Sequence, residues 1–210
     1  MCKVSNIIPV LNEASCLGLT LRCLQRLDPP AHQIIVVDGD STDATVAIAT
    51  HYQATVVKTQ QQGRAVQMNA GGELATGEIL SFVHGDTLVP NDLVTILCQT
   101  LATASVAGGG FISVMRGAQV TRWGLTLHNA LKTNYAPLEI RPYRYFRDGL
   151  RVLFGDQAIF CRHRDFFTCG GFDATLPIME DADFCLRLSK LGRIRQLNRV
   201  VHSSDRREAQ

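Results

Sequence analysis

Short apolar runs alternate with amphipathic segments along the first half of the chain. The runs, which predict strands, cover residues 4–10, 33–37, 54–58 and 78–83. Between them, leucines at helical spacing predict a helix over 13–26, and further helices are predicted over 43–51, with Ser41 or Thr42 as N-cap, and over 63–74. Strands that alternate with helices in this way form a parallel sheet covered on both faces.

The second half of the chain is less regular. A helix is predicted over 91–103, entered by Pro90, and Gly108 opens the irregular part. The further predictions are a helix over 122–131, a loop over 137–149, a strand over 157–161 and a helix over 180–191 stopped by Gly192. In the loop, arginines (141, 144, 147) are interleaved with aromatic residues. Two interpretations of this loop stay open: it closes over a ligand, or it forms a surface or oligomer contact.

Composition narrows the class of protein. The 210 residues fit one domain, and 19% charged with 46% hydrophobic residues argue against disorder. A net charge of +2 gives no overall field toward nucleic acid. No apolar run reaches the roughly 18 residues of a transmembrane helix, and residues 1–8 are too short for a secretory core. We therefore expect a cytoplasmic protein without a transmembrane segment, with peripheral contact to a membrane left open.

Seven cysteines are present, and none forms a CxxC pair. Most of them lie within apolar stretches. This pattern predicts buried, reduced thiols rather than disulfides or a zinc site.

Carboxylates follow two of the predicted strands. Asp86 comes after the run that ends at Val83, and Asp38 ends the run at 34–37. Open α/β folds bind ligands at the carboxyl edge of the sheet, and Mg²⁺ or Mn²⁺ needs few protein carboxylates when phosphate oxygens and water complete its shell. Asp86 is thus a predicted metal ligand. His84 is either a second ligand or a partner of a backbone group.

The hexapeptide 38–43 (DGDSTD) has two interpretations. Asp38 can accept hydrogen bonds from a base or from ribose hydroxyls, or it can serve a turn; for Asp43 we favour the turn and helix cap. A dinucleotide fingerprint is excluded, because 9–13 (PVLNE) stands where GxGxxG would follow the first strand.

Polar residues also mark two predicted helix starts. The guanidinium of Arg64 can bind a phosphate through two parallel hydrogen bonds. Gln67 fits a solvated helix face. Asn69 has two possible interpretations, a ligand contact or an internal hydrogen bond. Glu180 and Asp181 suit the helix dipole, yet either could serve as a general base for a hydroxyl.

Taken in order and spacing, five segments resemble family 2 glycosyltransferases over roughly residues 4–200. They are 8–13 (IPVLNE), 36–43 (VVDGDSTD), 84–86 (HGD), 170–172 (GGF) and 180–181 (ED). The segments 63–71 (GRAVQMNAG), 155–160 (GDQAIF) and 179–181 (MED) are similar to the subgroup of arsenosugar-biosynthesis type.

The resemblance implies an α/β GT-A fold: a Rossmann-like, mostly parallel central sheet flanked by helices, with a smaller mixed half. One domain, 1–210, would have a nucleotide-binding half over about 1–107 and an acceptor half over about 108–210.

It also implies roles for single residues. Asp86 would hold the metal, aided by His84 or His202; Asp181, beside Glu180, would be the base of an inverting transfer. In this chain, His84 stands at the position where the family's metal motif has its first carboxylate. The implied nucleotide-binding residues are Pro9, Leu11, Asn12, Glu13, Asp38, Arg64 and Asn69, and the implied acceptor or donor-sugar residues are Gly155, Asp156 and Gln157.

The predicted function is the transfer of a sugar from a UDP- or GDP-linked donor to a small-molecule or lipid acceptor, assisted by Mn²⁺ or Mg²⁺. A homo-oligomer is compatible with the sequence. One alternative is a sugar nucleotidyltransferase, although the Gly-rich phosphate loop of those enzymes is missing after the first strand. The other is a non-catalytic nucleotide-sugar-binding protein of the same fold.

Overall fold

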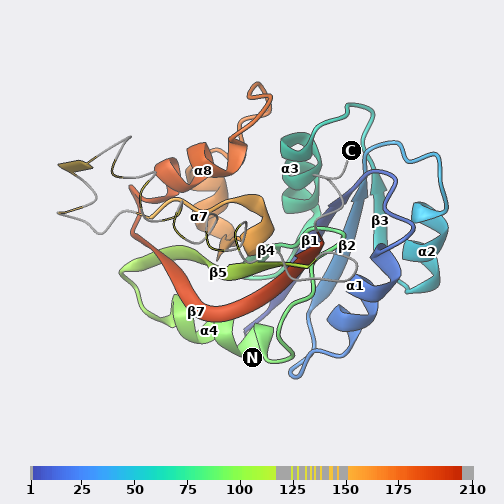
Figure 1. Ribbon diagram of the computed structural model, residues 1–210, viewed down its shortest axis with the longest axis horizontal. Coiled ribbons are helices and arrows are strands. Elements are labelled where there is room, and N and C mark those ends of the chain that lie inside the picture. The colour runs from blue at the N-terminus through green and yellow to red at the C-terminus, as the bar shows by residue number, and fades with distance from the viewer. Residues whose placement is uncertain are drawn as a thin grey trace.

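The computed structural model describes residues 2–116 and 151–204, with single positions between 124 and 146. The described residues form one seven-stranded sheet of order β3-β2-β1-β4-β6-β5-β7 (Figure 1). Only β6 runs against its neighbours in this sheet, so the predicted mostly parallel sheet is confirmed. The strands are β1 (Val4–Val10), β2 (Gln33–Asp38), β3 (Thr55–Lys58), β4 (Ile79–Phe82), β5 (Val106–Arg116), β6 (Phe160–Arg162) and β7 (Arg193–Ser204).

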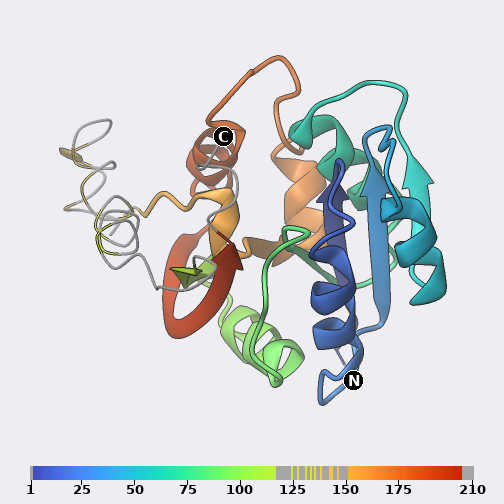
Figure 2. The same ribbon diagram turned by 45° about the vertical axis from the view of Figure 1, so that its right-hand side comes forward.

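Helices cover both faces of the sheet (Figure 2). One layer contains α1 (Leu17–Gln25), α2 (Thr45–His51) and α4 (Leu93–Ala102). The opposite layer contains α3 (Arg64–Leu74), α7 (His163–Thr168) and α8 (Glu180–Leu188), and a 3₁₀ turn, η1 (Gly155–Gln157), precedes β6. Because side chains alternate along a strand, Ile8 of β1 packs into the first layer and Ile7 into the second.

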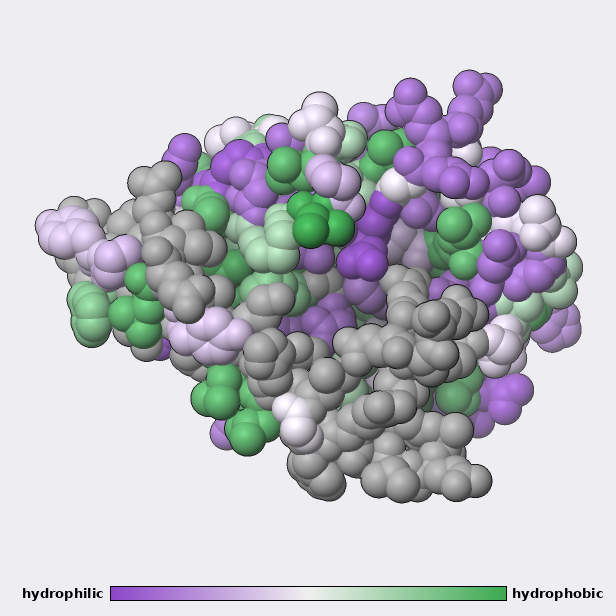
Figure 3. All heavy atoms as spheres, turned by 45° about the horizontal axis from the view of Figure 1, so that its top comes forward, coloured by the Kyte–Doolittle hydropathy of each residue, from purple (hydrophilic) through white to green (hydrophobic). Residues whose placement is uncertain are grey.

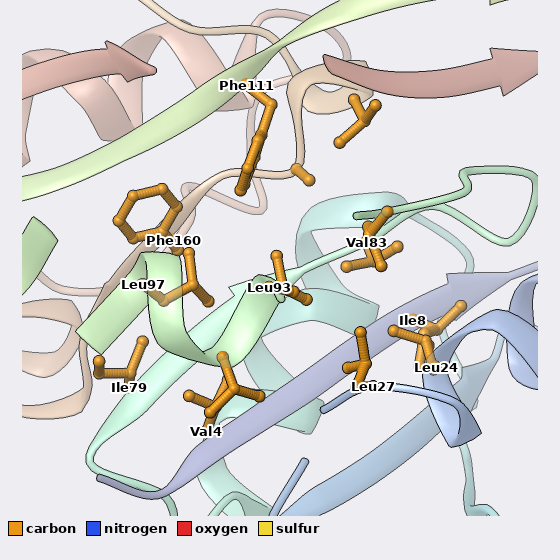
Figure 4. Close-up of a cluster of buried hydrophobic side chains, with 14 of the residues drawn as sticks. Val4, Ile8, Leu24, Leu27, Ile79, Val83, Leu93, Leu97, Phe111 and Phe160 are labelled. Atoms are coloured by element: carbon orange, nitrogen blue, oxygen red, sulfur yellow. The ribbon is translucent and has the colours of Figure 1, made fainter. Parts of the chain in front are cut away.

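Each face of the sheet has its own core. On the first face, Leu24, Leu93 and Leu97 pack over the strands (Figure 4). On the second, an aromatic cluster includes Phe172 and Phe184, whose rings stack with centroids 4.4 Å apart. There α3 approaches the sheet closely. A side chain at Gly71 would overlap Ile7, so α3 has little freedom to shift over the strands.

Most predicted elements of the first half are confirmed, but their boundaries differ. α1 begins only at Leu17, because a turn in which the Leu17 amide donates to the Glu13 carbonyl precedes it. The prediction of Ser41 or Thr42 as cap is wrong: α2 starts at Thr45, whose amide donates to the Asp43 carboxylate at 2.9 Å.

In the second half, the strand predicted over 157–161 is β6, which begins later because Gln157 closes η1. The strands β5 and β7, the helix α7 and the turn η1 were not predicted, and β5 occupies the start of the part that the sequence left as irregular. In β7 the buried Ile194 lies between the exposed Arg193 and Arg195, which is the alternation of a half-buried strand. The predictions for 122–131 and 137–149 lie outside the continuously described residues.

The cysteine prediction is partly wrong. Cys2, just before β1, and Cys98, in α4, form a disulfide across 96 residues. Sequence spacing gives no sign of this pair, because the fold alone brings the start of β1 next to α4. Cys161 and Cys185 are buried free thiols, as predicted, and burial raises the pKa of Cys185 to about 12.

Within the described part of the chain, no helix combines the length and apolar character needed to cross a membrane.

Candidate functional site

A cavity of about 770 Å³ opens at the carboxyl edge of the parallel strands. It is lined by Arg64 from the start of α3, Asp86 after β4, Asp156 in η1, and Glu180 with Asp181 at the start of α8. Figure 3 turns this edge toward the reader, and hydrophilic residues lie there beside a patch of hydrophobic ones. The fold therefore gathers charged residues from positions as far apart as 64 and 181 around one hollow.

The loops after β1 and β2 are joined into one unit. The Asn12 amide donates to Ser41 Oγ at 2.9 Å, and the Thr42 amide donates to Asn12 Oδ1 at 2.9 Å. The Glu13 amide donates to Thr45 Oγ1 at 2.8 Å. Asn12 has a positive φ of 55°, which turns the chain between these contacts. The loop that was predicted to bind the nucleotide is thus held by side chains of the segment that follows Asp38.

Asp38 is fully buried at the end of β2. Both of its carboxylate oxygens lie 3.2 Å from the Ser41 amide, so Asp38 closes a turn. This is one of the two roles that the sequence allowed for Asp38. Its neighbours in the predicted nucleotide set differ in access. Pro9 is buried within β1, whereas Leu11 is 42% exposed beyond the strand end.

Two amide side chains of α3 are internal. Gln67 is buried, and its Nε2 donates to the Val10 carbonyl at 2.7 Å and the Val37 carbonyl at 2.8 Å, so the solvated-face interpretation is wrong. Asn69 donates from Nδ2 to the Phe172 carbonyl and accepts from the Phe172 amide, both at 2.8 Å. Both ends of the Asn69 amide are thus engaged inside the protein, which is the internal hydrogen bond that the sequence left as one of two interpretations.

The acidic start of α8 faces the start of α3. Glu180 and Asp181 are 7% and 6% exposed, and Arg64 Nη1 lies 3.5 Å from Glu180 Oε1 and 3.8 Å from Asp181 Oδ2. Asp183, in the same helical turn, instead forms an ion pair of 2.6 Å with Arg187. The helix dipole is a sufficient reason for Asp183, but Glu180 and Asp181 open onto the cavity.

The three candidate metal ligands lie on two neighbouring segments. His84 and Asp86 line the cavity. His202, in β7, exchanges backbone hydrogen bonds of 2.8 and 2.9 Å with Leu88, which brings β7 to the turn after β4. Among the described residues, no group of three or more His, Cys, Asp or Glu side chains is arranged to hold a metal ion by itself. One half-buried carboxylate at Asp86 still fits an ion that takes most of its ligands from a diphosphate and water.

Gln157 is not available to a sugar or acceptor. Its side chain is fully buried, where Oε1 accepts from the Phe154 amide at 3.0 Å and Nε2 donates to Thr133 Oγ1 at 2.9 Å. Asp156, one residue earlier, does line the cavity. Gly155 is the first residue of η1. Of the three predicted residues, only Asp156 therefore has its side chain on the cavity.

A buried hydroxyl network beneath the cavity was missed by the sequence analysis. Thr87 Oγ1 lies 3.0 Å from Ser203 Oγ, and Ser203 Oγ donates to the Asp156 carbonyl at 3.3 Å. The network joins the turn after Asp86 to η1 through β7. The polar alternation of 193–204 could have indicated the strand, but not which hydroxyls meet.

The loop before α8 adds an apolar wall that was also missed. Leu176, Pro177, Ile178 and Met179 line the cavity, and Ile178 is 73% exposed. The cavity therefore has a charged side and an apolar side.

A family model described as Glycosyl transferase family 2 matches residues 5–168. Glycosyltransferase AglE of Haloferax volcanii is 34% identical over 91 residues, 40% of this chain and 30% of that protein. A PGL/p-HBAD biosynthesis glycosyltransferase of Mycobacterium bovis is 27% identical over 87% of this chain and 68% of its own length. The chain thus spans from under a third to about two thirds of these relatives.

Solved structures share the fold. The mannosyltransferase PcManGT of Pyrobaculum calidifontis, in complex with GDP-Man and Mn²⁺, gives a TM-score of 0.72 at 21% identity, over 96% of this chain and 56% of that one. Glucosyl-3-phosphoglycerate synthase of Mycobacterium tuberculosis, with Mn²⁺, UDP and phosphoglyceric acid, gives 0.70 at 18% identity, over 95% and 69%. The expected GT-A architecture is therefore confirmed.

Proposed function

The chain belongs to glycosyl transferase family 2, and on that premise we propose that it transfers a sugar from a nucleoside-diphosphate donor to an acceptor hydroxyl. One observation carries the proposal: the buried carboxylates of Glu180 and Asp181 open onto the same cavity as Asp86 and Arg64. In such a site, Arg64 and an ion held by Asp86 would bind the diphosphate, and one of the two carboxylates would act as the base. The GDP-Man and UDP bound to two structural neighbours support a GDP- or UDP-linked donor.

The nucleoside would lie over the joined loops after β1 and β2. Leu11 and Asn12 are exposed there, and Asp38 and Glu13 hold the loops from below. The diphosphate would then extend toward the start of α3. Arg64 stands at that helix N-terminus, where a guanidinium and free backbone amides favour an anion. We assign residues 1–107 mainly to the donor and 108–210 mainly to the acceptor.

Asp86 would hold the divalent ion together with diphosphate oxygens, and His84 or His202 would support it. When bound, the ion neutralises charge on the departing diphosphate. The Mn²⁺ in both neighbours supports this assignment. Asp86 lies in the short turn that follows β4, between the buried Val83 and the buried Thr87, which anchor the turn.

Asp181 would be the general base. In an inverting displacement its carboxylate accepts the proton of the acceptor hydroxyl while the hydroxyl oxygen attacks the sugar carbon and the bond to the diphosphate breaks. Burial at the first turn of α8 fixes the carboxylate, and Glu180 adds a second acceptor for the incoming hydroxyl. The acceptor itself stays within the predicted class of small molecules or lipids.

The first test is calorimetric titration with UDP and with GDP, each with and without Mn²⁺. We expect one nucleotide to bind, and to bind more tightly with the metal. Binding of neither by well-folded protein would contradict the proposed function.

The second test is Asp181→Asn, assayed as release of the nucleotide from its sugar donors in the presence of an acceptor panel. We expect about a 10³-fold loss of turnover with nucleotide binding retained, since a general base contributes roughly 10²–10⁴-fold. Asp183→Asn is the matched control, because it removes a charge from the same helical turn but away from the cavity. Nucleotide binding without turnover in the parent protein would favour the non-catalytic alternative.

A further inference from the structure

Arg64 has two competing partners at this site. Its guanidinium lies 3.5 Å from Glu180 and 3.8 Å from Asp181, while its side chain is 37% exposed toward the cavity. Both distances are longer than those of a close charge-assisted hydrogen bond, which measures about 2.7–2.9 Å. The guanidinium therefore balances the charge of the two carboxylates without being locked to either of them.

This ion pair is not what holds the two helices together. α3 and the segment before α8 are joined by the two hydrogen bonds between Asn69 and the Phe172 backbone. Arg187 of α8 further donates to the Gly171 carbonyl at 2.6 Å. Since these contacts fix the spacing of α3 and α8, Arg64 can leave the carboxylates without a change in the fold.

We propose that Arg64 is a donor-responsive positioning residue, which the bound diphosphate draws away from Glu180 and Asp181. The inference rests on the proposed function and adds to it an order of events. A phosphate group offers the guanidinium two short, parallel hydrogen bonds, whereas the carboxylates offer long and partly solvated contacts. Donor binding thus moves the Arg64 charge from the acidic pair to the diphosphate, so that an acceptor hydroxyl meets Asp181 after this contact has been released.

A consequence is that the acidic pair opposes donor binding through Arg64. With the nucleotide that binds the parent protein, Arg64→Gln should weaken the affinity about tenfold, as expected for loss of a charged phosphate contact of roughly 1.5 kcal/mol. Glu180→Gln should tighten it about threefold, because an exchangeable ion pair is worth roughly 0.5–1 kcal/mol. In the Arg64→Gln background, the Glu180→Gln effect should disappear.

The experiment is this double-mutant cycle, read as the dissociation constant in calorimetry rather than as activity. Asp183→Asn is the matched control: it removes an equal charge from the same turn, but its partner is Arg187. We expect coupling with Arg64 for Glu180 and none for Asp183. Equal effects of Glu180→Gln with and without Arg64, or equal coupling for both acidic residues, would overturn the inference.

Failure of the proposed function looks different. If the parent protein binds neither UDP nor GDP, the function is contradicted and the inference falls with it. If the parent binds but the cycle shows no coupling, only the role of Arg64 is lost. Arg64→Lys provides a second variant in case Arg64→Gln does not fold. It keeps the charge without the fork, so we expect an affinity between those of the parent and Arg64→Gln.

Discussion

The Asn69 side chain and the Phe172 backbone form a closed pair of hydrogen bonds across 103 residues of sequence. Nδ2 donates to the Phe172 carbonyl and Oδ1 accepts from the Phe172 amide, each at 2.8 Å. The pair connects α3, which carries Arg64, to the segment that leads into Glu180 and Asp181. It therefore sets the distance between the two sides of the cavity.

Replacement of Asn69 by Ala should lower stability without removing nucleotide binding. The change leaves a backbone carbonyl and amide of Phe172 without their partners, and we expect a loss of roughly 2 kcal/mol in the free energy of unfolding. Urea titration measures it. Glu73→Ala, at an exposed position of the same helix, is the control and should stay within about 0.5 kcal/mol. A large loss of nucleotide affinity in folded Asn69→Ala would instead show that Asn69 contacts the nucleotide.

Asp86→Asn should weaken the effect of the metal on nucleotide binding without weakening nucleotide binding itself. The amide keeps the shape of the side chain but loses the charge that a hard divalent cation prefers. We expect the gain in UDP or GDP affinity that Mn²⁺ provides to fall at least about tenfold, while the affinity without metal changes little. Calorimetry with and without Mn²⁺ measures both. Asp92→Asn, in an exposed ion pair with Arg199, is the charge-matched control. Undiminished Mn²⁺ dependence would exclude Asp86 as the ligand.

Asp43 should stabilise the protein at neutral pH and lose this contribution in acid. Hydrogen bonds from the Thr45 hydroxyl, and then from the Thr45 and Ala14 amides, lower the pKa of Asp43 from its ordinary value of 3.8. Because the folded-state pKa lies below the unfolded one, the contribution is fully present above about pH 4 and is lost as the pH falls through the folded value. The difference in urea midpoint between the parent and Asp43→Asn should thus be constant from pH 5 to 7 and shrink below pH 4. A constant difference down to pH 2 would contradict the shift.

Cysteine labelling should distinguish the disulfide partners from the buried free thiols. In native protein purified without reductant, iodoacetamide should leave the disulfide partners Cys2 and Cys98 unmodified until a reductant is added. Cys161 and Cys185 should resist labelling in the folded state with or without reductant, because burial excludes the reagent and raises the pKa of both thiols. Mass spectrometry of the labelled peptides measures each site. Rapid labelling of Cys2 before reduction would rule out the disulfide in solution.

Local pattern was enough to predict the sheet edge. Apolar runs and helical spacing are properties of neighbouring residues, so the strands and helices of residues 4–103 follow from the sequence to within a few positions. The parallel topology then places the carboxyl ends of β1, β2, β3 and β4 on one edge of the sheet. For that reason Asp38 and Asp86 could be assigned to a common edge before any contact was known.

The partners of polar side chains could not be predicted in this way. Gln67 was predicted to be a surface residue and Asn69 was left open between a ligand contact and an internal hydrogen bond, and each side chain reaches backbone groups 30 or more residues away. The same limit explains Gln157, whose amide lies against Thr133, and the Cys2–Cys98 disulfide. A hydrogen-bond donor in a helix has no local pattern that tells whether its acceptor is water, substrate or another strand.

The sequence alone determined the family resemblance, the alternation of elements and the carboxylates at the strand ends, because all three depend on the order and spacing of residues. The tertiary structure decided which of those charges face one another. It placed Arg64 against Glu180 and Asp181, and it brought β7 under the turn after Asp86. These relationships depend on how helices pack across the sheet, and packing joins residues that the chain keeps far apart.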